Sequence, residues 1–215
     1  MAILKLYGST QATCTRRVAT VLHELKVPFE LVPVDVQHGE HKTPAYLEKQ
    51  PFGQIPYIDD DGFILYETRA ICRYIAAKHP ESKLIPTEPK ANALFEQAAA
   101  VELTNFDPSA SKILYETVLK KMYGQQANPA VVEEQLAILD KKLDGYEAIL
   151  AKQKYVAGNE LTLADLFHVP YGPLLAQGGS DIMTRKPNVA RWYNELIARP
   201  SWLAYQGGVT TTTKY

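Results

Sequence analysis

Residues 51–71 constrain the fold of this chain more than any other stretch. Gln54-Ile55-Pro56 places a proline where an apolar segment begins, and a second apolar segment follows the Asp-Asp-Asp-Gly sequence at 59–62. An aspartate-glycine turn between two apolar segments is typical of a β-hairpin. Glu67-Thr68 then opens a run with the pattern of a helix. The stretch therefore predicts a strand, a turn, a strand and the start of a helix.

This order creates two sets of unpaired backbone groups. A proline at the start of a strand has no N–H for the ladder, so Ile55 keeps backbone groups that can pair with an extended peptide. X-Pro bonds are the ones that can be cis, and a cis bond at Pro56 would hold the strand end in a fixed turn. The first N–H groups of a helix that begins at Glu67-Thr68 are unpaired and lie at its positive end. Together these groups would suit a small peptide that carries a carboxylate.

The flanking sequence supplies the rest of a small α/β domain. Residues 3–8 and 29–34 are candidate strands, and the apolar residues between them repeat with the spacing of a helix. A short helix at 44–47 and the helix after residue 67 complete the order βαβαββα. Parallel strands joined by helices come first and a hairpin follows, which is the thioredoxin-like arrangement.

The character of the sequence changes after residue 79. Residues 80–89 are rich in turn-forming residues and predict a linker, and everything beyond them predicts helices. We therefore expect a thioredoxin-like domain at 1–79 and an all-helical domain at 90–215. Proline disrupts a helix interior, so residues 105–109 are expected to kink or break one helix. The segment 207–215, with four successive threonines, is expected to be loosely held.

A capping box and a histidine stand out in the helical part. Thr162 and Asp165 have the spacing at which each side chain can bond the other's backbone N–H, which predicts a structural helix start. His168 follows one turn later, and a lone helical histidine favours a packing role over catalysis.

Composition narrows the range of functions. The 215 residues include 23 basic and 24 acidic side chains, and the net charge of −1 argues against nucleic acid or an anionic membrane as the main partner. No apolar run approaches the roughly 20 residues that a membrane span needs. Cys14 and Cys72 are too few for a disulfide framework or a cysteine-rich metal site, so we expect no metal and a cytoplasmic protein. No Cys-x-x-Cys follows the first strand, which disfavours a thioredoxin-type redox enzyme.

The ordered motifs resemble those of a known family. Gln54-Ile55-Pro56 followed by Glu67-Thr68-Arg69-Ala70-Ile71 resembles the glutathione-binding half of glutathione transferases. Arg16-Arg17-Val18, Gly39-Glu40-His41-Lys42 and Pro51-Phe52-Gly53-Gln54 are most similar to the phi class of plants and fungi. The resemblance extends from about residue 4 to residue 205. It implies the same two-domain fold, glutathione as a substrate and a homodimer.

The resemblance also implies which residues hold glutathione. His41 and Lys42 match the pair that faces its glycine carboxylate. Gln54 and the Ile55 backbone match the positions that pair with its cysteinyl part, with Pro56 in a structural role. Glu67 and Thr68 match the pair that holds its γ-glutamyl end, where the family usually has serine in place of the threonine. Arg17 is expected to be structural.

One position departs from the family pattern. The phi class activates the glutathione thiol with a serine in the turn before the first helix, and that position is Ala12 here. A free thiol has a pKa of about 8.5, so the anion needs a donor to form near neutral pH. Three groups remain open for this role: Thr13, through its hydroxyl or its backbone N–H, then Ser9, and then Cys14 through mixed-disulfide chemistry.

A second substrate would lie between the two domains. The candidates to line its site are apolar and aromatic residues of the helical part: Tyr115, Leu119, Met122, Tyr123 and Tyr171. Such a surface selects hydrophobic molecules without strict specificity. The resemblance implies an enzyme that conjugates glutathione to hydrophobic electrophiles in detoxification, with a possible side activity on organic hydroperoxides. Because of Ala12, the alternative is a ligandin, which carries hydrophobic molecules with little catalysis.

Overall fold

The computed structural model describes residues 3–215 and divides the chain into two compact units. One unit contains the chain up to Ser82 together with Arg199–Tyr215, and the other is Lys83–Ala198. Residues 199–215, which the sequence pattern places with the helical part, thus belong to the first unit.

The first unit is built on a four-stranded mixed sheet in the order β2-β1-β3-β4. The strands are β1 (Leu4–Gly8), β2 (Phe29–Pro33), β3 (Tyr57–Asp60) and β4 (Phe63–Tyr66). β1 pairs parallel with β2 and antiparallel with β3, which forms a hairpin with β4. The predicted βαβαββα order and the thioredoxin-like fold are confirmed.

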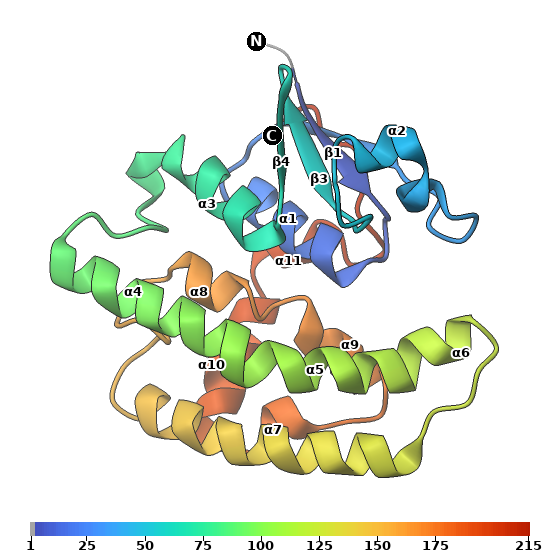
Figure 1. The fold of residues 1–215 in the computed structure, drawn as a ribbon. Coiled ribbons are helices and arrows are strands. Elements are labelled where there is room, and N and C mark those ends of the chain that lie inside the picture. The colour runs from blue at the N-terminus through green and yellow to red at the C-terminus, as the bar shows by residue number, and fades with distance from the viewer. Residues whose placement is uncertain (1–2) are drawn as a thin grey trace. The chain divides into compact units, whose positions relative to one another are not determined.

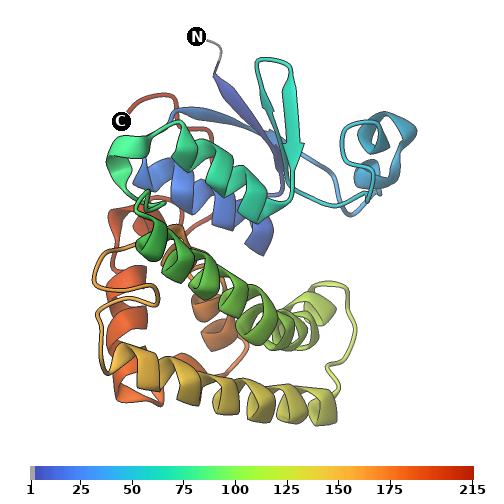
Figure 2. The same ribbon diagram turned by 60° about the vertical axis from the view of Figure 1, so that its left-hand side comes forward.

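Helices cover both faces of this sheet, as Figures 1 and 2 show. The helical elements are α1 (Thr13–Glu24), η1 (Glu40–Lys42), α2 (Pro44–Leu47), α3 (Thr68–Ala77), η2 (Pro80–Ser82) and α11 (Pro200–Leu203). α1 and α3 pack side by side on one face, and α2 lies on the other. Strand residues alternate accordingly: Leu6 and Ile58 are fully buried, while Tyr57 packs with Tyr46 of α2.

The expectation of a loosely held segment at 207–215 is wrong. Phe29 and Thr212 exchange two backbone hydrogen bonds of 2.8 and 3.0 Å, so the segment pairs with the outer edge of β2. Just before it, Arg199 and Ser201 donate hydrogen bonds to the Glu24 carboxylate at the end of α1. These contacts join residues more than 170 positions apart in the sequence, so no local pattern reveals them.

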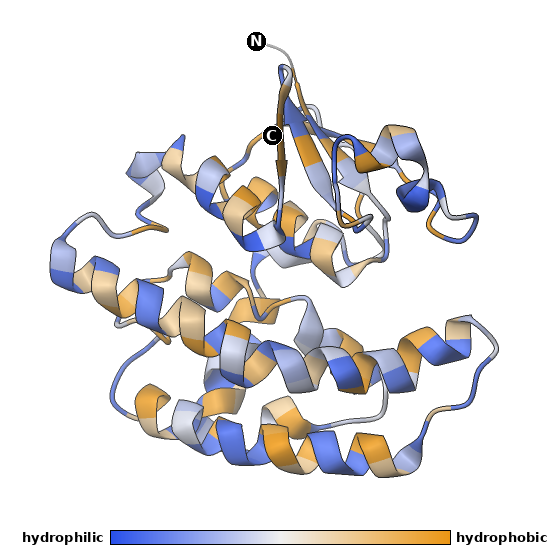
Figure 3. Cartoon of the chain, in the orientation of Figure 1, coloured by the Kyte–Doolittle hydropathy of each residue, from blue (hydrophilic) through white to orange (hydrophobic). Residues whose placement is uncertain are grey.

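The second unit consists of helices. They are α4 (Pro89–Val101), η3 (Glu102–Phe106), α5 (Asp107–Leu114), η4 (Tyr115–Leu119), α6 (Lys120–Met122), α7 (Pro129–Leu150), α8 (Leu163–Leu166), α9 (Tyr171–Gln177), η5 (Ile182–Thr184) and α10 (Pro187–Ile197). Figure 3 shows hydrophobic and hydrophilic bands alternating along α7. Its buried positions include Leu139, Leu143, Tyr146 and Leu150, the spacing expected of a helix packed in a bundle.

The helix that begins at Pro89 does not break at residues 105–109. It continues through η3 and η4, two π-helical segments, to Met122. Pro108 has no N–H for the carbonyl four residues back. We attribute the continuity to the wider π turn before it, which gives the helix room to pass the proline ring. No helix among residues 3–215 is long and apolar enough to cross a membrane.

The predicted capping box is present in the core of the second unit. Asp165 is fully buried and accepts hydrogen bonds from the Val156 and Thr162 amides, the Thr162 hydroxyl and the Trp192 indole. Burial raises the pKa of Asp165, and these four donors act in the opposite direction. His168 is also buried, with Nδ1 2.8 Å from the Ala164 carbonyl and Nε2 3.0 Å from the Tyr146 hydroxyl.

We predict that Asp165→Ala lowers the free energy of unfolding by about 3 to 5 kcal/mol, because it leaves four buried donors without an acceptor. Urea denaturation followed by circular dichroism measures this loss. Glu160→Ala, at an exposed position, is the control. A loss of stability no larger than that of the control would show that the box is dispensable.

The Glu24 cluster gives a pH-dependent prediction. Burial acts to raise the pKa of Glu24, but the hydrogen bonds from Arg199 and Ser201 and the charge of Arg199 outweigh it and lower that pKa. A lowered carboxyl pKa contributes stability that is present above the unfolded pKa of about 4.3 and is lost as pH falls through the folded value. Arg199→Met should therefore cost about 1 to 2 kcal/mol near neutral pH, allowing for solvent screening of this partly exposed pair.

The difference between wild type and Arg199→Met should shrink below about pH 4. Thermal unfolding of both proteins, near neutral pH and below about pH 4, measures this difference in stability. Arg185→Met, which breaks the exposed Arg185–Asp181 pair, serves as the control and should have little effect at either pH. An equal loss for Arg199→Met at both pH values would mean that Arg199 acts through packing rather than charge.

Candidate functional site

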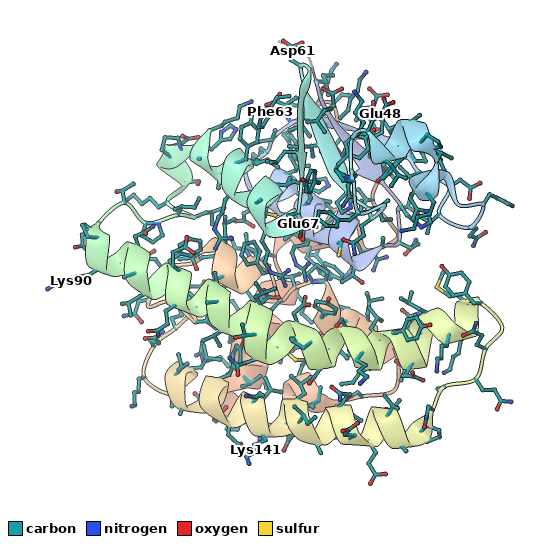
Figure 4. The ribbon with its side chains drawn as sticks, in the orientation of Figure 1. Glu48, Asp61, Phe63, Glu67, Lys90 and Lys141 are labelled. Carbon is teal, nitrogen blue, oxygen red and sulfur yellow. The ribbon has the colours of Figure 1, made fainter. Side chains whose placement is uncertain are left out.

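The residues predicted to hold a tripeptide all belong to the first unit. In Figure 4, Asp61 marks the tip of the β3–β4 hairpin, and Glu67 lies at the opposite end of the sheet, where α3 begins. The end of β1 and the start of α1 meet at this second end. A Cβ on Gly8 would lie 3.3 Å from the Pro56 Cβ and 2.4 Å from the Thr15 hydroxyl oxygen. Only glycine permits this close approach of strand, loop and helix.

The loop before β3 carries a cis bond between Ile55 and Pro56, as the sequence suggested. Two side chains that the sequence analysis did not single out hold this loop. The Tyr46 hydroxyl donates to the Gln54 carbonyl at 2.7 Å, and the buried Gln50 side chain accepts from the Gln54 amide at 3.2 Å. Burial first, with the charges of neighbouring groups adding to it, raises the pKa of Tyr46, so its hydroxyl stays a donor. The main chain of Gln54 is thereby fixed, while its side chain remains exposed.

His41 and Lys42 lie in η1, which contacts the turn at Gly53. The Lys42 ammonium donates to the carbonyls of Phe52 and Gly53 at 3.3 and 2.7 Å, so two of its three N–H groups are in use. His41 Nδ1 is buried and has no hydrogen-bond partner among residues 3–215. A buried ring nitrogen of this kind needs a partner, and a bound carboxylate can supply one.

Glu67 and Thr68 form the start of α3. Glu67 is an exposed residue with a positive φ of 69°, a strained conformation that is typical of binding positions. Thr68 is buried, and its hydroxyl accepts from Arg17 at 3.3 Å. The same Arg17 guanidinium lies 3.9 Å from the Cys14 sulfur. Arg17 is 1% exposed, so a buried positive charge connects the first turns of α1 and α3.

The turn at residues 9–12 leads into α1. Its backbone bond runs from the Ala12 amide to the Ser9 carbonyl at 3.1 Å, and the Ser9 amide donates to the Thr15 hydroxyl at 3.2 Å. Ala12 is the N-cap residue and gives the helix no side-chain cap. Thr13 and Cys14 are the first two helical residues, and both are partly exposed. The N–H groups of this first turn thus lie at the positive end of the helix dipole.

The apolar candidates of the second unit divide into two groups. Four of them lie exposed on η4, on α6 and just after it: Tyr115, Leu119, Met122 and Tyr123. Tyr171 is different, because it is 4% exposed and its hydroxyl donates to Asp107 at 2.9 Å. Tyr171 therefore has the contacts of a core residue. Among residues 3–215, no cluster of histidine, cysteine, aspartate and glutamate has the arrangement of a metal site.

Comparisons with known proteins give one consistent result. The family models for the N-terminal and C-terminal domains of glutathione S-transferase match residues 2–77 and 106–200. A glutathione S-transferase of Arabidopsis thaliana, PM239X14, is 48% identical over 198 residues, covering 90% of this chain and 91% of the relative. This relative is named as a transferase, so the carrier alternative gains no support from it.

Solved structures give the same result. Glutathione transferase F7 of Populus trichocarpa has a TM-score of 0.89 and 38% identity, and the match covers 95% of this chain and 98% of that one. Glutathione S-transferase I of maize, solved with an atrazine glutathione conjugate, has a TM-score of 0.86 and 35% identity, with 96% and 97% coverage.

The Tyr46 bond predicts a specific defect. Tyr46→Phe removes the donor to the Gln54 carbonyl, and a lost hydrogen bond of this kind costs about 1 to 2 kcal/mol. Since the bond fixes the backbone that would pair with the cysteinyl part, we expect glutathione to bind about 5- to 30-fold more weakly by calorimetry.

Tyr7→Phe is the matched control. Tyr7 stacks on Tyr57 in the same cluster, and no described residue bonds its hydroxyl. Equal affinities of wild type and Tyr46→Phe for glutathione would show that the Tyr46 hydrogen bond does not contribute to binding.

Proposed function

Because this chain belongs to the glutathione S-transferases, with relatives of the phi class, we propose that the thiolate which it conjugates to electrophiles forms at the first turn of α1. The single observation behind the proposal is the convergence at Gly8 of the cis-proline loop and the start of α1. A cysteinyl group paired with the loop backbone would place its sulfur at the end of β1, where this helix begins.

The rest of the tripeptide uses three sets of groups. The Ile55 backbone and Gln54 bind the cysteinyl part, beside the cis Pro56. Glu67 accepts from the γ-glutamyl ammonium, and Thr68 donates its hydroxyl and N–H to the adjoining carboxylate. The strained backbone of Glu67 supports this assignment, because such strain is kept where function requires it.

The glycine carboxylate of glutathione is assigned to His41 and Lys42. The His41 Nδ1 atom lacks a partner among the described residues, and these residues use two of the three Lys42 N–H groups, which leaves one for a ligand. A carboxylate bound here would satisfy both groups with charge-assisted hydrogen bonds.

Thiol activation must do without the serine of the family. Lowering the thiol pKa by about two units requires about 2.7 kcal/mol of preferential binding of the anion. Three groups together can supply a free energy of this size: the Thr13 hydroxyl, the first N–H groups of α1 and the nearby buried guanidinium of Arg17. Thr13 is our first assignment for the donor. Ser9 is second, because its main chain is fixed by hydrogen bonds within the turn, and its hydroxyl would reach the sulfur only if the turn shifted.

The electrophile is proposed to bind on the exposed residues Tyr115, Leu119, Met122 and Tyr123. The maize relative with its atrazine conjugate supports small aromatic electrophiles as the substrate class. The burial of Tyr171 argues against its contact with substrate. On the same family grounds we propose a cytoplasmic homodimer that also reduces organic hydroperoxides.

Titration of the bound thiol tests the activation step. The ultraviolet absorbance of thiolate in the glutathione complex should give a pKa about two units below that of free glutathione. Thr13→Ala should raise this pKa by about one unit or more and lower the turnover of a chloronitrobenzene by one to two orders of magnitude. Ala12→Ser should raise turnover, because it adds the donor that the family uses.

Thr87→Ala, an exposed threonine of the second unit, is the control and should behave as wild type. An unchanged rate in Thr13→Ala would transfer the role to Ser9, tested next as Ser9→Ala. If calorimetry finds no heat when glutathione is added to the wild-type protein, the proposed function is wrong.

A further inference from the structure

The segment 207–215 contacts two parts of the first unit. One is the edge strand β2, where the Thr212 pair with Phe29 is joined by a 3.0 Å hydrogen bond from the Leu31 amide to the Thr211 hydroxyl. This segment therefore satisfies backbone groups on the open edge of the sheet. In Figure 2 the end marked C lies with the sheet-bearing unit.

The other part is the turn that leads into α1. The Val209 amide donates to the Thr10 carbonyl at 3.0 Å, and the Gln11 side-chain amide donates to the Gly207 carbonyl at 3.0 Å. Val209 is fully buried, and a Cβ on Gly208 would lie 2.8 Å from the Gln11 side-chain nitrogen. The turn is thus held through the Thr10 backbone and the Gln11 side chain, and both bond to backbone groups of the same distant segment.

The turn has little else to fix it. Thr10 and Gln11 are both exposed. Ser9, at the start of the turn, is held by the backbone bond from Ala12 and by its own bond to the Thr15 hydroxyl, and neither bond involves Thr10 or Gln11. Exposed turns with few contacts open at low cost in free energy. The side-chain oxygen of Gln11 also accepts from Arg16, a buried residue of the first helical turn. A shift of Gln11 would therefore be passed on to α1.

We infer that residues 207–215 are a positioning segment for the thiol-activating turn, an inference that rests on the function proposed above. By tying Thr10 and Gln11 to the edge of β2, the segment holds the first N–H groups of α1 and Thr13 at hydrogen-bonding distance from the glutathione sulfur. Preorganised donors lose much of their effect when they are displaced by about 1 Å. Among the described residues, no hydrogen bond joins this segment to those proposed to bind the tripeptide at Gln54, Glu67 and Thr68, so we expect its effect to fall on the thiol rather than on affinity.

Two variants loosen the segment without touching glutathione. Thr212→Pro removes the N–H that donates to Phe29. Gln11→Met removes the amide that holds Gly207, together with the oxygen that accepts from Arg16, and leaves the charge unchanged. Thr213→Pro is the matched control, because no described residue bonds the amide of this exposed neighbour. Circular dichroism melts check that each variant folds. Should Thr212→Pro fail to fold, Gln11→Met decides, since its side chain is exposed.

The readout is the pH profile. In both variants the pKa of the bound thiol should rise by about 0.5 to 1 unit, so kcat near pH 6.5, close to the expected wild-type pKa, falls about twofold to fivefold. Above about pH 9 the thiol ionises unaided, and the loss should be less than about twofold. KM for glutathione should change less than about twofold, because Gln54, Glu67 and Thr68 keep their places.

A general loss of stability would lower kcat equally at every pH, and that result would overturn the inference. So would an unchanged thiol pKa in the folded variants, or an equal shift in Thr213→Pro. The wild-type protein separates this inference from the proposed function. If its own bound thiol has the pKa of free glutathione, the proposed activation fails. If the thiol pKa is lowered in the wild type and has the same value in the variants, the positioning role alone fails.

Discussion

The structure of the candidate site depends on the close approach of three segments of the chain at Gly8. The end of β1, the cis-proline loop and the first turn of α1 meet where any side chain would collide with Thr15 or Pro56. This contact brings a peptide-pairing edge and a helix N-terminus together, which are two features that no single element supplies. The sheet, α1 and α3 can be understood as the support that keeps these segments in place.

Arg17 is the second element on which the site depends. A buried guanidinium is costly unless hydrogen bonds and nearby negative charge offset its desolvation. Here it contacts the Thr68 hydroxyl and lies beside Cys14, between the two helix starts. In the proposed complex the thiolate and the γ-glutamyl carboxylate are anions at these same helix starts. Its contacts fit the structural role expected from the sequence, and in the proposed complex its charge would also favour the bound anions.

The sequence predicted those features whose causes are local. Apolar spacing revealed the strands and helices, Gln54-Ile55-Pro56 marked the cis-proline loop, and Thr162 with Asp165 marked a helix start. It missed features created by contacts between distant residues. Nothing near Thr212 indicates that it pairs with Phe29, and nothing near Tyr46 indicates that its hydroxyl reaches Gln54. The π turns before Pro108 were missed for a related reason, since the kink rule considers only the proline itself.

Ala12 connects these observations. A serine hydroxyl rotates about its side-chain torsion, so it can reach a sulfur although the backbone is slightly displaced. A backbone N–H has no such freedom, and the Thr13 hydroxyl follows the backbone of the helix start closely because a β-branched side chain has few rotamers. Losing the serine therefore makes thiol activation more sensitive to the position of the turn. A chain with alanine at this position has more need of external contacts that hold Thr10 and Gln11, and the pairing of residues 207–212 with the turn and with β2 provides them.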